Sequence, residues 1–250
     1  MTVLMTKLSV NVNKIALLRN ARALDLPDLG RLAGLALKSG AHGITIHPRP
    51  DERHIRKSDV LPLSKVIKQF PDAEFNIEGN PFHQLMDIVR EIKPHQVTLV
   101  PDAMAASTSD HGWDLTTDGE RLRPIVQELK ALKIRVSLFM DPLAHQMIVA
   151  KELGADRIEL YTEAYANAYK TSDQDQVTVK YRDAAVSAVK VGLGINAGHD
   201  LNLNNLSYFL SQVPEVEEVS IGHALTADAL EYGIESTVER YLFEIQSSYT

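Results

Sequence analysis

Eight short strand-like runs alternate with longer segments of helical periodicity along this chain, and this alternation limits its possible folds more than any other feature. The strand-like runs are LSVNVN (8–13), GITIH (43–47), EFNIE (74–78), QVTLV (96–100), RVSLFM (135–140), RIELY (157–161), GLGINAG (192–198) and EVSIGH (218–223). The helix-like segments cover roughly 29–37, 58–69, 80–92, 118–132, 142–153, 174–190, 202–212 and 225–246. Strands that alternate with helices in this way form βαβ units, in which neighbouring strands run parallel.

The number of these units predicts the architecture. A closed (β/α)₈ barrel has eight strands, each followed by a helix, and typically spans about 250 residues. The chain has 250 residues, and its sequence contains no linker or low-complexity tract. We therefore predict a single-domain (β/α)₈ TIM barrel over residues 1–250, with extra short helices allowed. A doubly wound open sheet is the alternative.

The strand-like runs themselves alternate between apolar and polar residues. In the second run, Ile44 and Ile46 oppose Thr45 and His47. Successive side chains of a strand point to opposite faces. We therefore expect the apolar face to pack on the helices and the polar face to line the barrel interior. An antiparallel sandwich with one solvated face would show the same alternation, but the helical segments argue against it.

Composition and charge exclude several classes of function. The chain has no cysteine, which rules out disulfides, a thiol nucleophile and a thiolate metal site. Its formal net charge of −7 argues against a general nucleic-acid binder, so any phosphate-binding surface must be a local basic pocket. No apolar run approaches a membrane span, and the N-terminus lacks the apolar core of a signal peptide. We therefore expect a cytoplasmic protein without nucleic-acid or membrane partners.

Ionisable side chains gather at the predicted C-terminal ends of the strands, where barrel enzymes have their active sites. Three histidines and one glutamate occupy these ends: His47, Glu78, His199 and His223. Asn11 and Asn13 lie at the end of the first strand. Burial raises the pKa of a carboxyl group, which would suit Glu78 to general-base chemistry. The alternative role for Glu78 is a structural ion pair with a barrel arginine.

Glycines and basic residues near the same strand ends predict phosphate binding. The stretches NAGHDLN (196–202) and IGHALTAD (221–228) each place a glycine between a strand and a helix, as in barrel phosphate sites. A second anion site would be formed by Arg22, Arg49, Arg53 and His54. Arginine suits this role because its planar guanidinium donates two hydrogen bonds to a phosphate at once. Two separate anion sites predict two phosphorylated substrates or one bisphosphate.

Five motif blocks, read together and in order, resemble the pyridoxine 5′-phosphate synthase family nearly end to end. The blocks are NVNKIALLRNAR (11–22), GITIHPRPDERHI (43–55), FNIEGNP (75–81), INAGHDLN (195–202) and IGHA (221–224). The resemblance implies a (β/α)₈ barrel without cofactor or metal that assembles into a homo-octamer. It also implies a reaction between two small phosphorylated substrates. In that reaction 1-deoxy-D-xylulose 5-phosphate condenses with 3-amino-2-oxopropyl phosphate, and phosphate and water are released.

The same resemblance assigns roles to individual residues. His47 and Glu78 match the family's proton acceptors, and His199 matches its proton donor. The positions that contact the aminoketone phosphate are Asn11, Arg22, Asp200, Gly222 and His223. The positions that contact the deoxyxylulose phosphate are Arg49, His54 and Thr108.

The chain departs from the family's pattern in two places. Asn13 and Lys14 stand where the pattern commonly has Asp-His, and Lys14 can still meet a phosphate or a hydroxyl group. Asp200 stands where glycine is common. Its carboxylate would repel a bound phosphate unless the side chain turned away to cap the next helix.

Two other functions fit parts of the pattern. A metal-dependent hydrolase would use four ligands, which are His47, Glu78, His199 and His223. The H-x-H pair that such barrels often carry on the first strand is absent, because Asn11 and Asn13 stand there. A non-catalytic protein that binds a phosphorylated ligand would keep the glycine loops but would not need Glu78.

The connection 102–119 is predicted to be a lid over the site. It is long, rich in small and polar residues, and contains the single tryptophan, Trp113. Long loops in compact domains often close over ligands, and closure would protect an imine intermediate from water.

Overall fold

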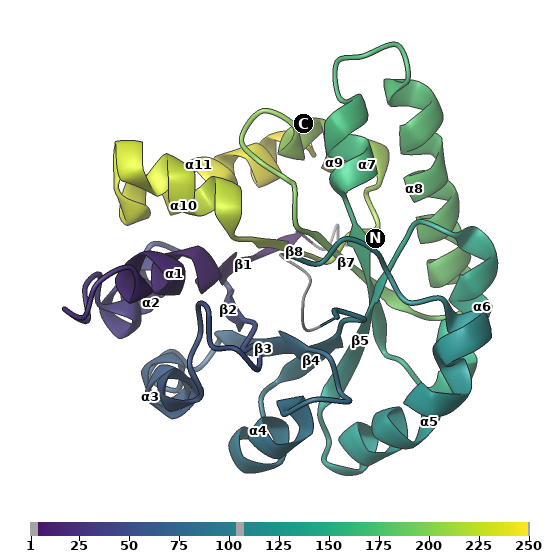
Figure 1. The fold of residues 1–250 in the computed structure, drawn as a ribbon. Helices are drawn as coiled ribbons and strands as arrows, with labels where there is room; N and C mark the ends of the chain where they lie inside the picture. The colour runs from purple at the N-terminus through teal and green to yellow at the C-terminus, as the bar shows by residue number, and fades with distance from the viewer. Residues whose placement is uncertain (1–4, 104–107, 250) are drawn as a thin grey trace.

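The computed structural model of the chain describes residues 5–103 and 108–249, and their strands close into a parallel barrel (Figure 1). In chain order the strands are β1 (Lys7–Asn11), β2 (Gly43–Ile46), β3 (Glu74–Gly79), β4 (Gln96–Leu99), β5 (Arg135–Met140), β6 (Arg157–Tyr161), β7 (Gly194–Gly198) and β8 (Glu218–Ile221). Each strand pairs with the next, and β8 pairs with β1 to complete the ring. The predicted (β/α)₈ barrel is confirmed, and the open sheet and the antiparallel sandwich are wrong.

Helices surround this barrel on its outer side (Figure 1). In the described residues they are α1 (Asn13–Asn20), α2 (Leu29–Lys38), α3 (Lys57–Ile67), α4 (Leu85–Ile92), α5 (Leu115–Ala131), α6 (Met147–Leu153), α7 (Glu163–Ala168), α8 (Gln174–Lys190), α9 (Leu206–Gln212), α10 (His223–Tyr232) and α11 (Ile234–Ser247). A short 3-10 turn, η1 (Ala144–Gln146), precedes α6. The predicted segments correspond to these helices except for α1 and α7, which are the extra short helices that the prediction allowed.

The differences from the predicted elements lie mostly at their ends. The first strand was predicted to reach Asn13, but β1 ends at Asn11 and Asn13 begins α1. The predicted helix 225–246 is two helices, because Gly233 adopts a φ of 77° between them. Glycine readily adopts this left-handed conformation, which cannot continue a right-handed helix.

Side-chain caps fix the starts of two helices. The Asp28 carboxylate accepts a hydrogen bond from the backbone N–H of Arg31 and starts α2. The Asp114 carboxylate does the same for the N–H of Thr116, so α5 begins at Leu115, earlier than the predicted 118. A cap satisfies backbone donors that have no partner within the helix.

Polar side chains fill the barrel interior, as the alternation of the strands predicts. Ser9 Oγ lies 2.7 Å from Thr45 Oγ1, and Asn76 Nδ2 donates to the same Thr45 oxygen at 3.3 Å. Thr98 Oγ1 then donates to Asn76 Oδ1 at 3.2 Å. On the other face of β2, Ile44 is fully buried in the hydrophobic core that the helices share with the sheet. These interior hydrogen bonds satisfy polar groups that would otherwise be costly to bury.

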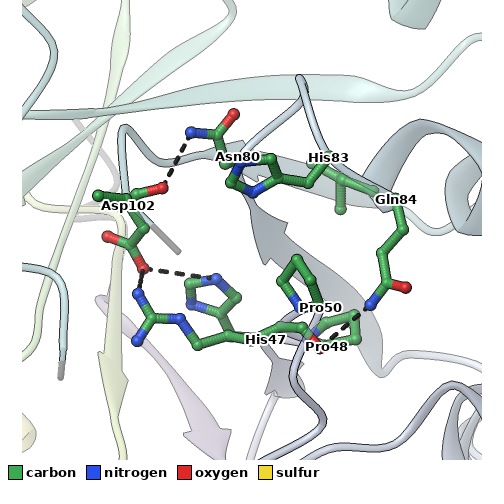
Figure 2. Close-up of a pocket in the computed structure, with 10 residues that line it drawn as sticks. His47, Pro48, Pro50, Asn80, His83, Gln84 and Asp102 are labelled. Carbon is green, nitrogen blue, oxygen red and sulfur yellow. Dashed lines mark hydrogen bonds and ion pairs between the residues drawn. The ribbon is translucent and has the colours of Figure 1, made fainter. Parts of the chain in front are cut away.

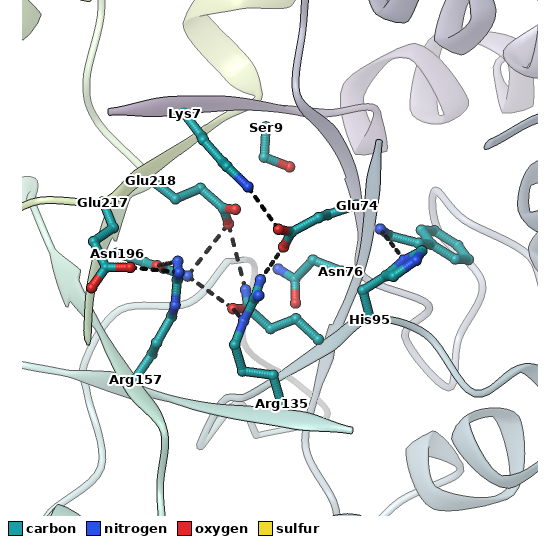
Figure 3. Close-up of polar contacts among 12 residues, drawn as sticks. Lys7, Ser9, Glu74, Asn76, His95, Arg135, Arg157, Asn196, Glu217 and Glu218 are labelled. Carbon is teal, nitrogen blue, oxygen red and sulfur yellow. Dashed lines mark hydrogen bonds and ion pairs between the residues drawn. The ribbon is translucent and has the colours of Figure 1, made fainter. Parts of the chain in front are cut away.

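Ion pairs tie together the N-terminal ends of the strands (Figure 3). Lys7 Nζ donates to Glu74 at 2.9 Å, and Arg135 donates to the same carboxylate. Across the barrel, Arg157 donates to Glu217 at 2.6 Å. This network occupies the N-terminal end, so a ligand site must be sought at the opposite end of the strands.

Candidate active site

A cavity of about 470 Å³ opens at the C-terminal ends of the strands. This volume is within the usual range for small-molecule sites. All of the site residues predicted from the sequence line the cavity except Arg22. Three residues that we did not predict, Asp102, Glu159 and Ser220, also line it. Residues far apart in the chain therefore meet at one place, as the placement of strand ends predicts.

Arg22 is the predicted site residue that the fold does not bring to this cavity. It follows α1, its side chain is exposed, and it does not line the cavity wall. Arg53, which we predicted for the second anion site, does line the cavity, and its guanidinium pairs with Asp51 at 2.6 Å. A role for Arg22 in binding phosphate remains a prediction.

Glu78 projects into the cavity from β3. Its Oε2 accepts a hydrogen bond from Asn11 Nδ2 at 3.5 Å. The barrel arginines pair with other acids: Arg49 with Asp102, Arg135 with Glu74, and Arg157 with Glu217. Burial, and then the charges of Glu159 and Asp102, raise the pKa of Glu78 well above its ordinary value. Glu78 can therefore hold a proton nearer to neutral pH than an exposed glutamate, which suits it to proton exchange with a substrate.

Two further carboxyl groups lie inside the barrel, and we did not predict either as a site residue. Glu159 is buried at the cavity wall, where Thr98 Oγ1 donates to its Oε2 at 3.3 Å. Burial, and then the charge of Glu218, raise the pKa of Glu159 to about 8. Burial also raises the pKa of Glu218, against which Gln96 Nε2 lies at 3.5 Å. The sequence did carry a signal for Glu159, because this residue lies on the inward-facing side of its strand.

Asp102 joins His47 and Arg49 in a buried cluster beside the cavity (Figure 2). Its Oδ2 accepts a hydrogen bond from Arg49 Nη2 at 2.7 Å and lies 3.6 Å from His47 Nε2. Its backbone carbonyl accepts from Asn80 Nδ2 at 3.0 Å. Burial, and then the charge of Arg49, lower the pKa of His47 to about 3. The imidazole is therefore neutral near pH 7, and one of its ring nitrogens can accept a hydrogen bond.

Basic side chains gather on the same side of the cavity. His54 is buried, and its Nδ1 accepts a hydrogen bond from the backbone N–H of Ile55 at 2.9 Å. Burial, and then His47 and Arg49, lower the pKa of His54 to about 3. Neutral His54 therefore carries its proton on Nε2, which can donate to a ligand. Lys14 and Arg49 line the cavity as well, and together with His54 they make this side of the cavity suitable for an anion.

His199 directly follows β7 and has a partner on each ring nitrogen. Its Nε2 lies 2.8 Å from Thr108 Oγ1, and its Nδ1 lies 2.6 Å from Asp200 Oδ2. The Asp200 carboxylate does not cap the next helix: it contacts His199, and α9 begins only at Leu206. His199 also has a φ of 94°. A left-handed conformation strains a residue other than glycine by about 1–3 kcal/mol and is common at functional sites.

Asn11, which ends β1, and Asn13, which begins α1, hold the neighbouring strand end. Asn13 Oδ1 accepts a hydrogen bond from the backbone N–H of His47 at 2.9 Å, and Asn11 Oδ1 accepts from the N–H of Asn13 at 3.0 Å. Gly222 lies close to the first of them, since a Cβ at this position would be 3.1 Å from the Asn11 side chain. His223 begins α10 and is exposed at the cavity mouth.

The predicted lid is only partly described. Residues 104–107 lie outside the described residues, and α5 already begins at Leu115. Trp113 is buried, and its Nε1 donates to the Leu99 carbonyl at 2.8 Å. Closure of the connection 102–119 over the site therefore remains a prediction.

The described residues were also compared with the side-chain arrangement of a metal site and with the helix length and apolar character of a membrane span. Within residues 5–103 and 108–249, no group of three or more His, Asp or Glu side chains is arranged to hold a metal ion. Two histidines that a metal-dependent hydrolase would use instead contact carboxylates, His47 that of Asp102 and His199 that of Asp200. In the same residues, no helix has both the length and the apolar character that crossing a membrane requires.

Comparison with known sequences identifies the family. The model for "Pyridoxal phosphate biosynthesis protein PdxJ" matches residues 8–247, which extend from β1 to the last residue of α11. The chain belongs to the PdxJ family. A pyridoxine 5′-phosphate synthase from Albidiferax ferrireducens is 54% identical over 242 residues, which cover 95% of this chain and 96% of the relative. One from Cytophaga hutchinsonii is 51% identical and covers 97% of this chain and 100% of the relative.

Solved structures outside the PdxJ family share only its fold. A tryptophan synthase from M. tuberculosis superimposes with a TM-score of 0.67 at 9% identity, over 97% of this chain and 93% of that chain. A phosphoribosyl anthranilate isomerase from Thermotoga maritima gives a TM-score of 0.61 at 14% identity, over 97% and 99%. The resemblance that the five motif blocks indicate is confirmed by the family match and by relatives near 50% identity.

Proposed function

We propose that this protein is a pyridoxine 5′-phosphate synthase. It condenses 1-deoxy-D-xylulose 5-phosphate with 3-amino-2-oxopropyl phosphate to form pyridoxine 5′-phosphate, and releases phosphate and water. One observation carries this proposal. In a chain of the PdxJ family, His47, Glu78 and His199 converge on one cavity whose wall also contains Arg49 and Lys14.

The proposed chemistry needs the groups that the cavity contains. An amine and a ketone condense to an imine, so no lysine of the protein has to act as nucleophile. Water and phosphate then leave and a carbon–carbon bond closes the ring, and each of these steps transfers a proton. Glu78 and neutral His47 accept protons in this scheme, and His199 donates one. Formation of the aromatic ring supplies the final driving force.

The proposed binding roles divide the remaining residues into two groups. The deoxyxylulose phosphate contacts Arg49, His54 and Thr108. The aminoketone phosphate contacts Asn11, Arg22, the backbone of Asp200, Gly222 and His223. The start of α10 directly after Gly222 supports the second group, because backbone N–H groups at a helix N-terminus attract anions. We place Asn13 and Lys14 at the substrates as well, with Lys14 supplying a positive charge.

The test is to incubate the purified protein with both phosphorylated substrates. We expect pyridoxine 5′-phosphate by mass spectrometry, together with an equal amount of inorganic phosphate. Reactions with each substrate alone serve as controls and should give no product. A folded wild-type protein that makes no pyridoxine 5′-phosphate from saturating concentrations of both substrates would contradict the proposal.

The same assay separates the two alternative functions. A metal-dependent hydrolase would lose its activity in a chelator. The proposed condensation should continue in a chelator, because side chains carry out its proton transfers. A non-catalytic binding protein would bind one phosphorylated ligand in calorimetry and form no product. The family match favours the synthase over both.

We also propose that residues 1–250 act as one domain, and that the chain assembles as a homo-octamer in the cytoplasm. Exposed leucines on α1 and the connection after it support assembly, because burial between copies would remove them from water. These side chains are Leu17, Leu18, Leu24 and Leu26. Light scattering after gel filtration should give eight times the 27.8 kDa mass of the chain, and the mass of a single chain would contradict the octamer.

A further inference from the structure

His199 is held at both ring nitrogens by side chains of its own chain. Its Nδ1 faces the Asp200 carboxylate at 2.6 Å, and its Nε2 faces Thr108 Oγ1 at 2.8 Å. All three residues line the cavity. A carboxylate that accepts from one nitrogen of an imidazole fixes which nitrogen exchanges protons with a substrate.

We propose that Asp200 is a positioning residue that keeps a proton on His199 Nδ1 and so makes Nε2 the nitrogen that donates to the substrate. This inference rests on the proposed function, in which His199 is the proton donor. The protonated imidazole gives its Nε2 proton to the hydroxyl oxygen of the amine–ketone adduct. The C–O bond breaks as the nitrogen lone pair forms the C=N bond of the imine, and the hydroxyl leaves as water. The neutral ring keeps its other proton on Nδ1, hydrogen-bonded to Asp200, until solvent returns a proton to Nε2.

The backbone around Asp200 is fixed by three hydrogen bonds. Its N–H donates to Thr162 Oγ1 at 3.2 Å, and Thr162 Oγ1 donates to the Gly198 carbonyl at 2.7 Å. The Asp200 carbonyl accepts from Asn205 Nδ2 at 3.2 Å. These contacts, with the φ of 94° at His199, turn the chain so that two neighbouring side chains meet. Consecutive residues in an extended strand point to opposite faces and could not make this contact.

The imidazole ring is also held from the side. Tyr161 packs against it edge to face, with ring centroids 5.1 Å apart, and the Tyr161 hydroxyl donates to Glu163 at 2.8 Å. A ring fixed in this way has little freedom to exchange the positions of its two nitrogens.

The same pairing explains how an acid is tolerated where the family commonly has glycine. A free carboxylate in this loop would repel the phosphate that we propose to bind beside it. Because the Asp200 carboxylate is directed to His199, its charge is balanced whenever the ring is protonated. An aspartate at position 200 therefore gives His199 a carboxylate partner, and does not only add a negative charge to the loop.

The direct test is ¹⁵N NMR of histidine-labelled protein in alkaline buffer without substrate, with His199→Gln used to identify the His199 signals. In the wild type we expect the neutral ring to carry its proton on Nδ1. In Asp200→Gly we expect a mixture of the two tautomers, because Nδ1 has lost its acceptor. A wild-type ring with its proton on Nε2, or a ring that is the same in both proteins, would overturn the inference.

Steady-state kinetics provide the second test. In Asp200→Asn and Asp200→Gly, kcat should fall roughly 10- to 100-fold, less than for loss of a general acid itself. KM for the aminoketone phosphate should stay the same or fall, because a negative charge has been removed. A raised KM with unchanged kcat would show a substrate contact, and a lowered melting temperature with unchanged kcat would show a structural role; either overturns the inference.

The matched control is Asp110→Asn. Asp110 and His111 are also sequence neighbours, and their carboxylate and Nδ1 lie 2.5 Å apart, but both are exposed and neither lines the cavity. This variant should keep the wild-type kcat. Failure of the proposed function is recognised separately: a wild type that forms no pyridoxine 5′-phosphate refutes the synthase, while the NMR experiment still decides the pairing of His199 with Asp200.

Discussion

The carboxylate of Asp102 lies 2.7 Å from the guanidinium of Arg49, and both side chains are about 5% exposed. The same Asp102 oxygen is 3.6 Å from His47 Nε2. One acid from the connection after β4 therefore contacts two candidate site residues from the connection after β2. This arrangement links the position of a proposed phosphate-binding arginine to that of a proposed proton acceptor.

Replacing Asp102 with Asn should destabilise the protein strongly. Arg49 would lose the carboxylate that balances its charge inside the protein, and breaking a buried pair in this way costs about 3–5 kcal/mol. Urea unfolding measures the loss. Asp51→Asn is the control, because it removes one carboxylate from a pair with Arg53 that is partly open to solvent, and such pairs are worth about 0–1 kcal/mol. Similar losses in the two variants would show that burial of the Asp102 pair contributes little.

Replacing Glu78 with Gln should impair catalysis without unfolding the protein. The amide keeps the shape of the side chain but cannot accept a proton, so kcat should fall by roughly 10²–10⁴. Stability should stay the same or rise, because burial and neighbouring acids already raise the pKa of Glu78 and disfavour its charged form. Kinetics and thermal unfolding on the same variant measure both effects.

The opposite result would support the structural role of Glu78 that the sequence left open. In that case the melting temperature would fall sharply and the folded fraction would keep a near-normal kcat. The contacts of Glu78 favour its catalytic role. Its carboxylate accepts a hydrogen bond from the amide of Asn11, and the arginines 49, 135 and 157 pair with other acids.

The fold and most of the cavity could be predicted because both follow from periodicity. Alternation along the strand 74–78 puts Asn76 and Glu78 on one face, and a parallel barrel brings all such faces to the interior. The same logic applies to His47 at the end of β2. These predictions need only the residue pattern and the parallel direction of the strands.

The contacts between loops could not be predicted in the same way. Asp102 lies three residues beyond the end of its strand, and no periodicity shows that it turns towards Arg49. The pairing of Asp200 with His199 depends on a left-handed backbone at His199, which sequence rules reserve mainly for glycine. Arg22 was placed by its charge and by a motif, and its position on an exposed connection depends on how α1 ends.

Replacing Gly222 with Asp should weaken binding of the aminoketone phosphate. A Cβ at this position would already lie 3.1 Å from Asn11, and the added charge would repel a phosphate at the start of α10. Calorimetry should show a large loss of affinity, with a smaller loss in Gly222→Ala, which tests crowding without charge. Circular dichroism checks that both variants fold. Unchanged affinity in Gly222→Asp would remove this loop from the phosphate site.

Gly198 provides a contrasting case within the same wall of the barrel. A Cβ there would lie 2.7 Å from the Ser220 carbonyl and 2.7 Å from Glu159 Oε1, distances at which the backbone must move. Gly198→Ala should therefore lower the melting temperature more than Gly222→Ala does, because only the first change forces β7 away from β8. Equal melting temperatures for the two alanine variants would contradict this packing argument.

Replacing Glu159 with Gln should change how stability depends on pH. Burial, and then Glu218, raise the pKa of Glu159 from 4.5 to about 8, so between these values the folded protein holds a proton that the unfolded chain has lost. Stability from this group is fully present below about pH 4.5 and is lost as pH rises towards 8, at up to about 1.4 kcal/mol per pH unit. Glutamine does not titrate, so the variant should gain stability relative to the wild type as pH rises.

Urea unfolding of the wild type and Glu159→Gln at pH 5.5, 7 and 8.5 measures this difference. Glu78 and Glu218 remain in the variant and their pKa values are also raised, so its stability should still fall with pH, but less steeply. Glu91→Gln, which changes an exposed carboxylate on α4, should leave the slope of the wild type unaltered. A stability difference between wild type and Glu159→Gln that is the same at all three pH values would mean that Glu159 is already ionised at pH 5.5 in the folded protein. Glu159 would then be a fixed negative charge inside the barrel.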